Sequence, residues 1–213
     1  MAFCTRCNKR AAKRYCPALL YNICAVCCAE DRMIELACPE SCPYLHAARE
    51  SEGKREREMR VRELPAYGQM SSGLREKLVP ALVTIDAAIA EAYRELKSAD
   101  HVSIHDADVA AALDNTIRNL ETEDRGIIYE HKALSPLVQE LGRRLHTALD
   151  ELNKRDEELH VLRSEMIKAL NLVRDTVRAH LRLAGGGSSE SRSYIRHVSL
   201  FAPWPAASPP LII

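Results

Sequence analysis

All eight cysteines of this 213-residue chain lie between residues 4 and 42. They include two Cys-x2-Cys pairs, Cys4/Cys7 and Cys24/Cys27. The other four are Cys16, Cys28, Cys38 and Cys42. Thiolates are soft ligands, so a segment this rich in cysteine can bind metal, form disulfides or carry out redox chemistry.

The cysteine spacing predicts two structural zinc sites. A Cys-x2-Cys pair lets one tight turn present two thiolates to one ion, and zinc takes four ligands in a tetrahedron. The two pairs therefore predict a first site of Cys4, Cys7, Cys24 and Cys27. The remaining cysteines predict a second site of Cys16, Cys28, Cys38 and Cys42. Because Cys16 lies between the two pairs in sequence, the sites would interleave as a cross-brace.

The fourth ligand of the second site has two candidates. Pro43 suits the first position of a helix, and Cys42 and His46 are four residues apart. That spacing places both side chains on one face of the expected helix. His46 could therefore replace Cys28, and the sequence leaves both alternatives open.

The first 45 or so residues resemble the B-box, a cross-brace zinc module with cysteine spacings similar to those of Cys4 to Cys27. The run Arg14-Tyr15-Cys16-Pro17 also resembles HIT-type zinc fingers. The chain departs from the B-box at Leu19, where that family has a ligand, and in ending on Cys38-x3-Cys42. The resemblance implies protein–protein interaction and oligomer assembly without catalysis. The chain as a whole is also similar to uncharacterised Cys-rich bacterial proteins, which implies no function.

The N-terminal sequence favours a reducing compartment. It has no apolar leader segment, and no run of apolar residues is long enough to span a membrane. Eight cysteines without an export signal predict metal-bound thiolates in the cytoplasm rather than disulfides. An iron–sulfur cluster is a weaker alternative, because Cys38-x3-Cys42 fits it poorly.

Five basic residues precede Cys16 without an intervening acid: Arg6, Lys9, Arg10, Lys13 and Arg14. Such a run can bind nucleic acid. However, two zinc ions with eight thiolates carry a net charge of about −4. Residues 1–66 hold 12 Lys/Arg and 9 Asp/Glu, so the basic excess would nearly balance the two sites. We therefore favour charge balance over nucleic-acid binding as the role of this run.

The rest of the chain predicts helices, so the expected fold is mostly α: a zinc module (1–48), a charged helical linker (49–73) and a helical bundle or coiled coil (74–184). Apolar residues recur at helical spacing from Leu78 to Leu96. Ser103 and Asp106 predict the start of a second helix. A heptad-like run from Val138 to Val173, with Leu159 and Leu162 on its apolar face, predicts one long helix or two.

Residues 185–213 predict a flexible tail, because a Gly/Ser stretch precedes a Pro-rich end that contains Trp204. Within this tail, residues 191–201 could also form two helical turns. The sequence contains no phosphate-binding loop and no recognised catalytic motif. We therefore expect a non-catalytic, zinc-dependent interaction or scaffolding protein that forms homo-oligomers and does not bind membranes. The alternatives are a nucleic-acid-binding zinc finger, and a redox or metallo-enzyme.

Overall fold

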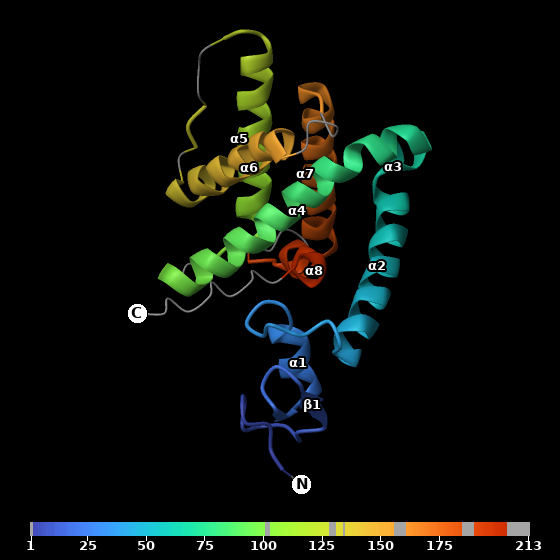
Figure 1. The fold of residues 1–213 in the computed structure, drawn as a ribbon, viewed down its shortest axis with the longest axis vertical. Coiled ribbons are helices and arrows are strands. Elements are labelled where there is room, and N and C mark those ends of the chain that lie inside the picture. The colour runs from blue at the N-terminus through green and yellow to red at the C-terminus, as the bar shows by residue number, and fades with distance from the viewer. Residues whose placement is uncertain are drawn as a thin grey trace.

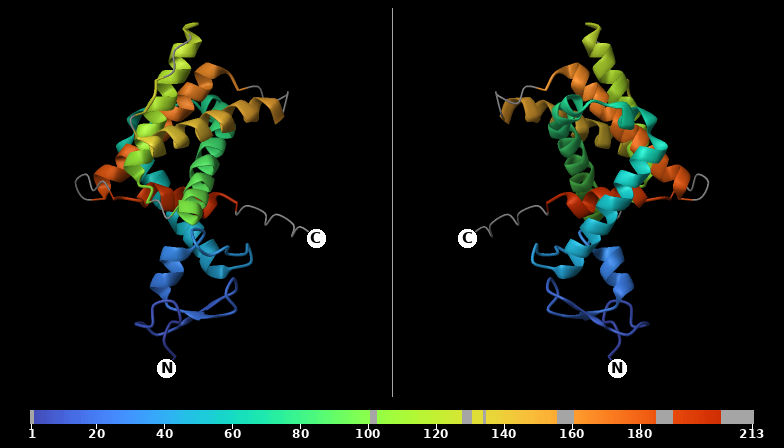
Figure 2. Two further views of the ribbon diagram at one scale, coloured as in Figure 1. Left: turned by 90° about the vertical axis from the view of Figure 1, so that its left-hand side faces the viewer. Right: turned by 90° about the vertical axis from the view of Figure 1, so that its right-hand side faces the viewer.

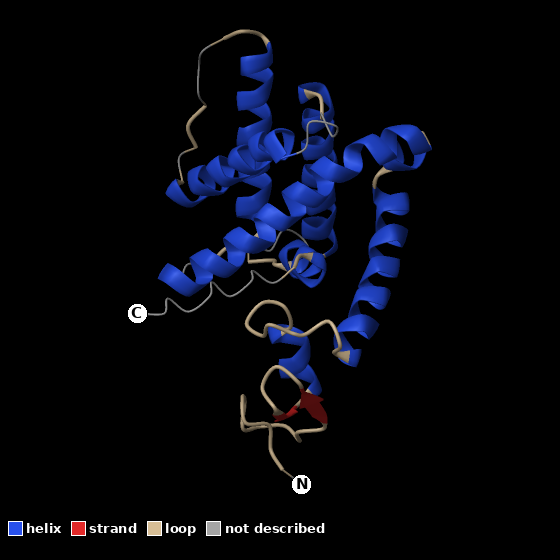
Figure 3. Ribbon diagram, in the orientation of Figure 1, coloured by secondary structure: helices blue, strands red, loops and turns tan. Residues whose placement is uncertain are grey.

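The structure is a computed structural model, and it describes residues 2–100, 103–127, 131–133, 135–155, 161–184 and 190–203. Helices dominate these ranges, together with one small sheet (Figures 1 and 3). The expected mostly-α fold class is therefore confirmed. Within these ranges, no helix combines the length and low polarity needed to cross a bilayer.

The cysteine-rich segment folds as a small module at one end of the molecule. Strands β1 (Arg14–Cys16) and β2 (Tyr21–Ile23) pair antiparallel, and helix α1 (Ala25–Asp31) follows them. The largest buried cluster within the module consists of cysteines together with Ile23 and Leu36. Sulfur thus replaces much of the apolar core that a segment this short cannot supply.

Two helices connect the module to the bundle. Helix α2 (Pro43–Glu63) begins at a proline, which is well tolerated at the first helical position, and α3 (Pro65–Gln69) follows it. Helix α2 carries many charges, yet it buries Leu45, Glu56 and Met59. Figure 2 shows α2 running beside the bundle. The charged linker expected from the sequence is thus a helix with one packed side.

Four helices build the main core: α4 (Ser72–Asp100), α5 (Asp106–Asp124), α6 (Pro136–Arg155) and α7 (Arg163–Leu183). In Figure 1, α4 and α6 cross over α5 and α7. Their apolar faces meet in one cluster, in which Leu78, Leu113 and Leu170 are completely buried. The periodic apolar residues thus pack against each other within a single chain.

Two local expectations for the bundle differ from the structure. Helix α5 begins at Asp106 rather than Ser103, and the N–H of His105 donates to the Asp108 carboxylate at 2.9 Å. The run from Val138 to Val173 forms two helices, which is one of the two expected alternatives, but Leu162 caps the start of α7 and is 53% exposed instead of lying on the apolar face. Leu159 lies outside the described residues.

The expectation of a flexible tail is wrong for residues 193–201, which form helix α8 (Ser193–Phe201). Tyr194, Ile195 and Val198 are buried in the main core because they share one helical face. Leu200 packs against Met33 and Cys42, so α8 lies between the bundle and the cysteine-rich module. Residues 185–189 and 204–213, and with them Trp204, lie outside the described ranges.

Candidate metal centre

The structure brings the two Cys-x2-Cys pairs together. The Sγ atoms of Cys4, Cys7, Cys24 and Cys27 all lie within 4.8 Å of one another. A tetrahedral zinc ion with Zn–S bonds of about 2.3 Å holds its sulfur ligands about 3.8 Å apart. The Sγ atoms of Cys7 and Cys24 are 3.9 Å apart. These four thiols could therefore hold one metal ion.

Local backbone structure positions each pair. The N–H of Asn8 donates to the Cys4 carbonyl at 2.7 Å and closes the first turn. Asn8 has a φ of 50°, a left-handed conformation that asparagine adopts more readily than most residues. In the second pair, Cys24 is the N-cap of α1, and its Sγ accepts from the N–H of Cys27 at 3.4 Å. A tight turn and a helix start thus direct their thiols at one point.

The four thiols lie so close together that their pKa values depend on one another, and a bound cation would favour the deprotonated form of all four. Burial raises the pKa of Cys4, but nearby N–H groups, including those of Cys24 and Cys7, outweigh it and lower the pKa to about 6. Burial raises the pKa of Cys27, and the neighbouring thiols raise it further. Like charges this close cannot all form without a counter-charge. A divalent ion would provide that charge and deprotonate all four.

The cysteines predicted for a second site are less tightly gathered. Cys38 lies near Cys42 and Cys16: burial raises its pKa, and the charges of both neighbours raise it further. Among the residues that the structure describes, however, these cysteines do not form a second group as tight as the first. A second metal site therefore stays a prediction.

The two candidates for the remaining ligand have different surroundings. Cys28 is buried, and its Sγ accepts a hydrogen bond from Nη2 of Arg32 at 3.4 Å. His46 is exposed on the first turn of α2. The choice between these two residues stays open.

Three of the five basic residues before Cys16 have partners inside the module. Nε of Arg6 lies 2.5 Å from the Asp31 carboxylate, and the guanidinium of Arg14 lies 4.8 Å from the centre of the Tyr44 ring. Arg10 lies beside the thiols of the first group, and its hydrogen bond to Cys24 raises its pKa. The remaining members, Lys9 and Lys13, are exposed. Much of this run thus already serves contacts within the module.

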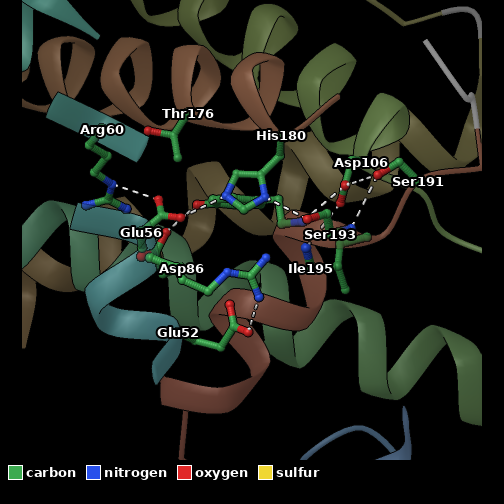
Figure 4. Close-up of polar contacts among 12 residues, drawn as sticks. Glu52, Glu56, Arg60, Asp86, Asp106, Thr176, His180, Ser191, Ser193 and Ile195 are labelled. Carbon is green, nitrogen blue, oxygen red and sulfur yellow. Dashed lines mark hydrogen bonds and ion pairs between the residues drawn. The ribbon is translucent and has the colours of Figure 1, made fainter. Parts of the chain in front are cut away.

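A second polar cluster, which the sequence did not reveal, lies where α2, α7 and α8 meet (Figure 4). Nε2 of His180 lies 2.9 Å from Oε2 of Glu56, and Nδ1 lies 2.9 Å from Oγ of Ser193. Arg60 donates to Oε1 of Glu56 at 2.8 Å. Burial raises the pKa of Glu56, but His180 and the nearby cations lower it to about 2. Glu56 is therefore ionised at neutral pH.

The order serine, histidine, carboxylate resembles an acyl-transfer triad, but its surroundings favour a structural role. Such chemistry needs N–H groups that are free to bind a developing oxyanion. At the start of α8, the N–H groups of Tyr194 and Ile195 each donate to the Asp106 carboxylate, at 3.1 Å in both cases. The cluster therefore joins helices, with these donors already engaged.

No protein-family model matches the chain, and neither a curated protein nor a solved structure is similar enough to it to match. The function must therefore be inferred from the geometry of the chain itself.

Proposed function

We propose that this protein is a zinc-dependent interaction or scaffolding protein without catalytic activity. The observation that carries the proposal is the group of four thiols within 4.8 Å of one another. A set of four thiols, three of them buried here, is typical of closed structural zinc sites, in which every coordination position is filled by the protein. Such a site supplies folding free energy to a segment with little apolar core.

The proposal includes a second zinc ion, bound by Cys16, Cys38 and Cys42 together with either Cys28 or His46. The proximity of Cys38 to Cys42 and Cys16 supports it. Two ions would also offset the basic residues of the module. Because the thiolates must stay reduced, we place the protein in the cytoplasm.

Exposed apolar side chains on the module support an interaction role. Of the twelve large apolar residues that are exposed in the described ranges, five belong to this small module. They are Phe3, Tyr15, Leu20, Tyr21 and Val26. Leu20, at the turn between β1 and β2, is 76% exposed. Aromatic and aliphatic residues that a small module leaves in solvent are suited to contact with another protein, including a second copy of this chain.

Crosslinking in the native cell, followed by identification of the captured proteins, tests this proposal. The wild type is compared with Leu20→Ser, with Cys7→Ser, and with Val83→Ser as a matched control. Val83 is 61% exposed, but it lies on α4. We expect a set of proteins that wild type and Val83→Ser capture and that the other two variants lose.

Capture of the same proteins by all four chains would contradict the proposal, because neither the metal site nor the apolar turn would then matter. Nucleic-acid binding by the same purified chains provides a further check. Steep weakening with salt and loss on substitution of Lys9 and Lys13 would favour the nucleic-acid alternative instead.

A further inference from the structure

A cavity of about 430 Å³ lies between the cysteine-rich module and α8. We call it the junction pocket. One wall comes from the module and includes Arg32, a second comes from α2 and includes Glu52, and a third comes from α8 and the residues just before it. Ligand pockets commonly measure about 300–1,000 Å³, so the junction pocket could hold a small molecule.

The charge of the lining is strongly positive. Four of the lining residues are arginines: Arg32, Arg55, Arg192 and Arg196. The lining contains one carboxylate, that of Glu52, which accepts from Nη1 of Arg55 at 2.9 Å. The lining residues therefore carry four guanidinium groups and one carboxylate, although the whole chain has no net charge. A pocket with this excess attracts anions.

Unsatisfied polar atoms gather at the same place. Among the described residues, four buried side-chain nitrogen or oxygen atoms lack a hydrogen-bond partner, and three of them belong to the pocket lining. These three are Nε of Arg32, Nε of Arg192 and Nδ1 of His197. Arg32 is 9% exposed and His197 is 8% exposed. Leaving a buried polar atom unsatisfied costs about 1–3 kcal/mol, so their concentration here points to an absent partner.

We propose that the junction pocket binds a small phosphate-bearing anion. Guanidinium groups match phosphate oxygens with paired N–H donors. A ligand with a single carboxylate would leave most of the positive charge of the pocket uncompensated. A phosphate monoester brings up to two negative charges and three acceptor oxygens. The volume leaves room for the organic part of such a molecule. This inference does not depend on the proposed interaction function.

The junction pocket lies where the module meets the bundle, so a bound ligand would affect how these two parts are held together. Arg32 also donates to Cys28 of the module, and His197 belongs to α8, whose neighbouring residues lie in the main core. A bound anion would therefore contact both the module and the bundle. Its binding would stabilise the relative position of the two parts, because it adds contacts that neither part makes alone.

Isothermal titration calorimetry on the full-length, metal-loaded protein tests the proposal, with inorganic phosphate and glycerol 3-phosphate as probes at constant ionic strength. We expect saturable binding of both, and tighter binding of the ester because it fills more of the pocket. Acetate at the same concentration should bind at least about tenfold more weakly, since it lacks the second charge.

Three variants make the test specific. Arg196→Gln removes an exposed lining charge and should weaken binding by about tenfold, while Arg118→Gln removes an exposed charge from α5 and should leave binding unchanged. Glu52→Gln removes the one lining carboxylate and should strengthen binding. Absence of saturable binding would overturn the proposal. Equal weakening by the two arginine variants would also overturn it, because the anion would then respond only to overall charge.

Discussion

Nε of Arg94 donates to the backbone carbonyl oxygen of Met33 at 3.0 Å, which joins α4 to the loop that follows α1. The same guanidinium donates to the carbonyls of Ser199 at 3.0 Å, Ala202 at 3.3 Å and Pro203 at 2.8 Å. Arg94 is 8% exposed, and burial lowers its pKa. Met33 has a φ of 55°, a conformation that methionine rarely adopts without support. One buried side chain thus connects the module, α4 and the end of α8.

We expect Arg94→Lys to destabilise the protein substantially. A lysine ammonium is a compact point charge and cannot reproduce the planar fork that reaches four carbonyls. Each buried acceptor left without a partner costs about 1–3 kcal/mol, so the free energy of unfolding should fall by about 3 kcal/mol. Urea unfolding followed by circular dichroism measures this loss.

Arg118→Lys is the matched control, because Arg118 is exposed on α5. It should unfold at the same urea concentration as the wild type. If Arg94→Lys also unfolded there, the hydrogen bonds of Arg94 to these carbonyls would contribute nothing measurable, and Arg94 would not be what attaches the module to the bundle.

Asp106 of α5 caps α8 from another part of the chain. Its carboxylate accepts from the N–H groups of Tyr194 and Ile195 and from the Ser191 hydroxyl at 2.8 Å. The substitution Asp106→Asn keeps the shape of the side chain but removes its negative charge and one of its two acceptor oxygens. We expect a loss of about 1–2 kcal/mol, with faster hydrogen exchange of the α8 amides.

Hydrogen exchange measured by mass spectrometry can separate this local effect from general loosening. Asp150→Asn, an exposed substitution on α6, serves as the control. Unchanged protection of α8 in the Asp106→Asn protein would show that the cap is not what holds this helix in place.

His197 makes stability depend on pH. Burial lowers its pKa from 6.5 to about 4, against the opposing charge of Glu56. The folded state therefore favours the neutral ring, so this stabilisation is complete above pH 6.5 and is lost as the pH falls towards 4. Arg60 and His180 also lie near the ring and disfavour its protonation.

The difference in unfolding free energy between wild type and His197→Gln isolates this group. It should shrink by about 2–3 kcal/mol as the pH falls through that range, because glutamine does not titrate. The comparison is needed because Asp86, whose pKa burial raises to about 6, contributes with the opposite sign. A difference that did not vary with pH would mean that His197 is protonated equally well in the folded and unfolded chains.

The parts of this protein that could be predicted from sequence are those with a local signal. Cys-x2-Cys spacing identifies Cys4, Cys7, Cys24 and Cys27 as partners, and the structure gathers these four thiols. Helical periodicity likewise predicted the apolar residues of α4 to α7, because each repeat lies within a few residues of the next.

The parts that could not be predicted depend on distant contacts. Helix α8 is short, and its cap is Asp106, which lies 88 residues before Tyr194. Glu56 belongs to a run of charged residues in which its burial has no local signature, and its partner His180 lies 124 residues away. Likewise, Leu162 follows the heptad-like pattern, but it is the N-cap residue of α7 and is exposed.

The proposed pair of zinc sites is tested most directly by the metal content per chain of protein purified without chelator. Plasma mass spectrometry measures it for wild type, Cys7→Ser and Cys38→Ser. We predict two zinc ions in the wild type and the loss of a different one in each variant. Iron in place of zinc, or a Cys7→Ser protein that keeps all of its metal, would contradict it.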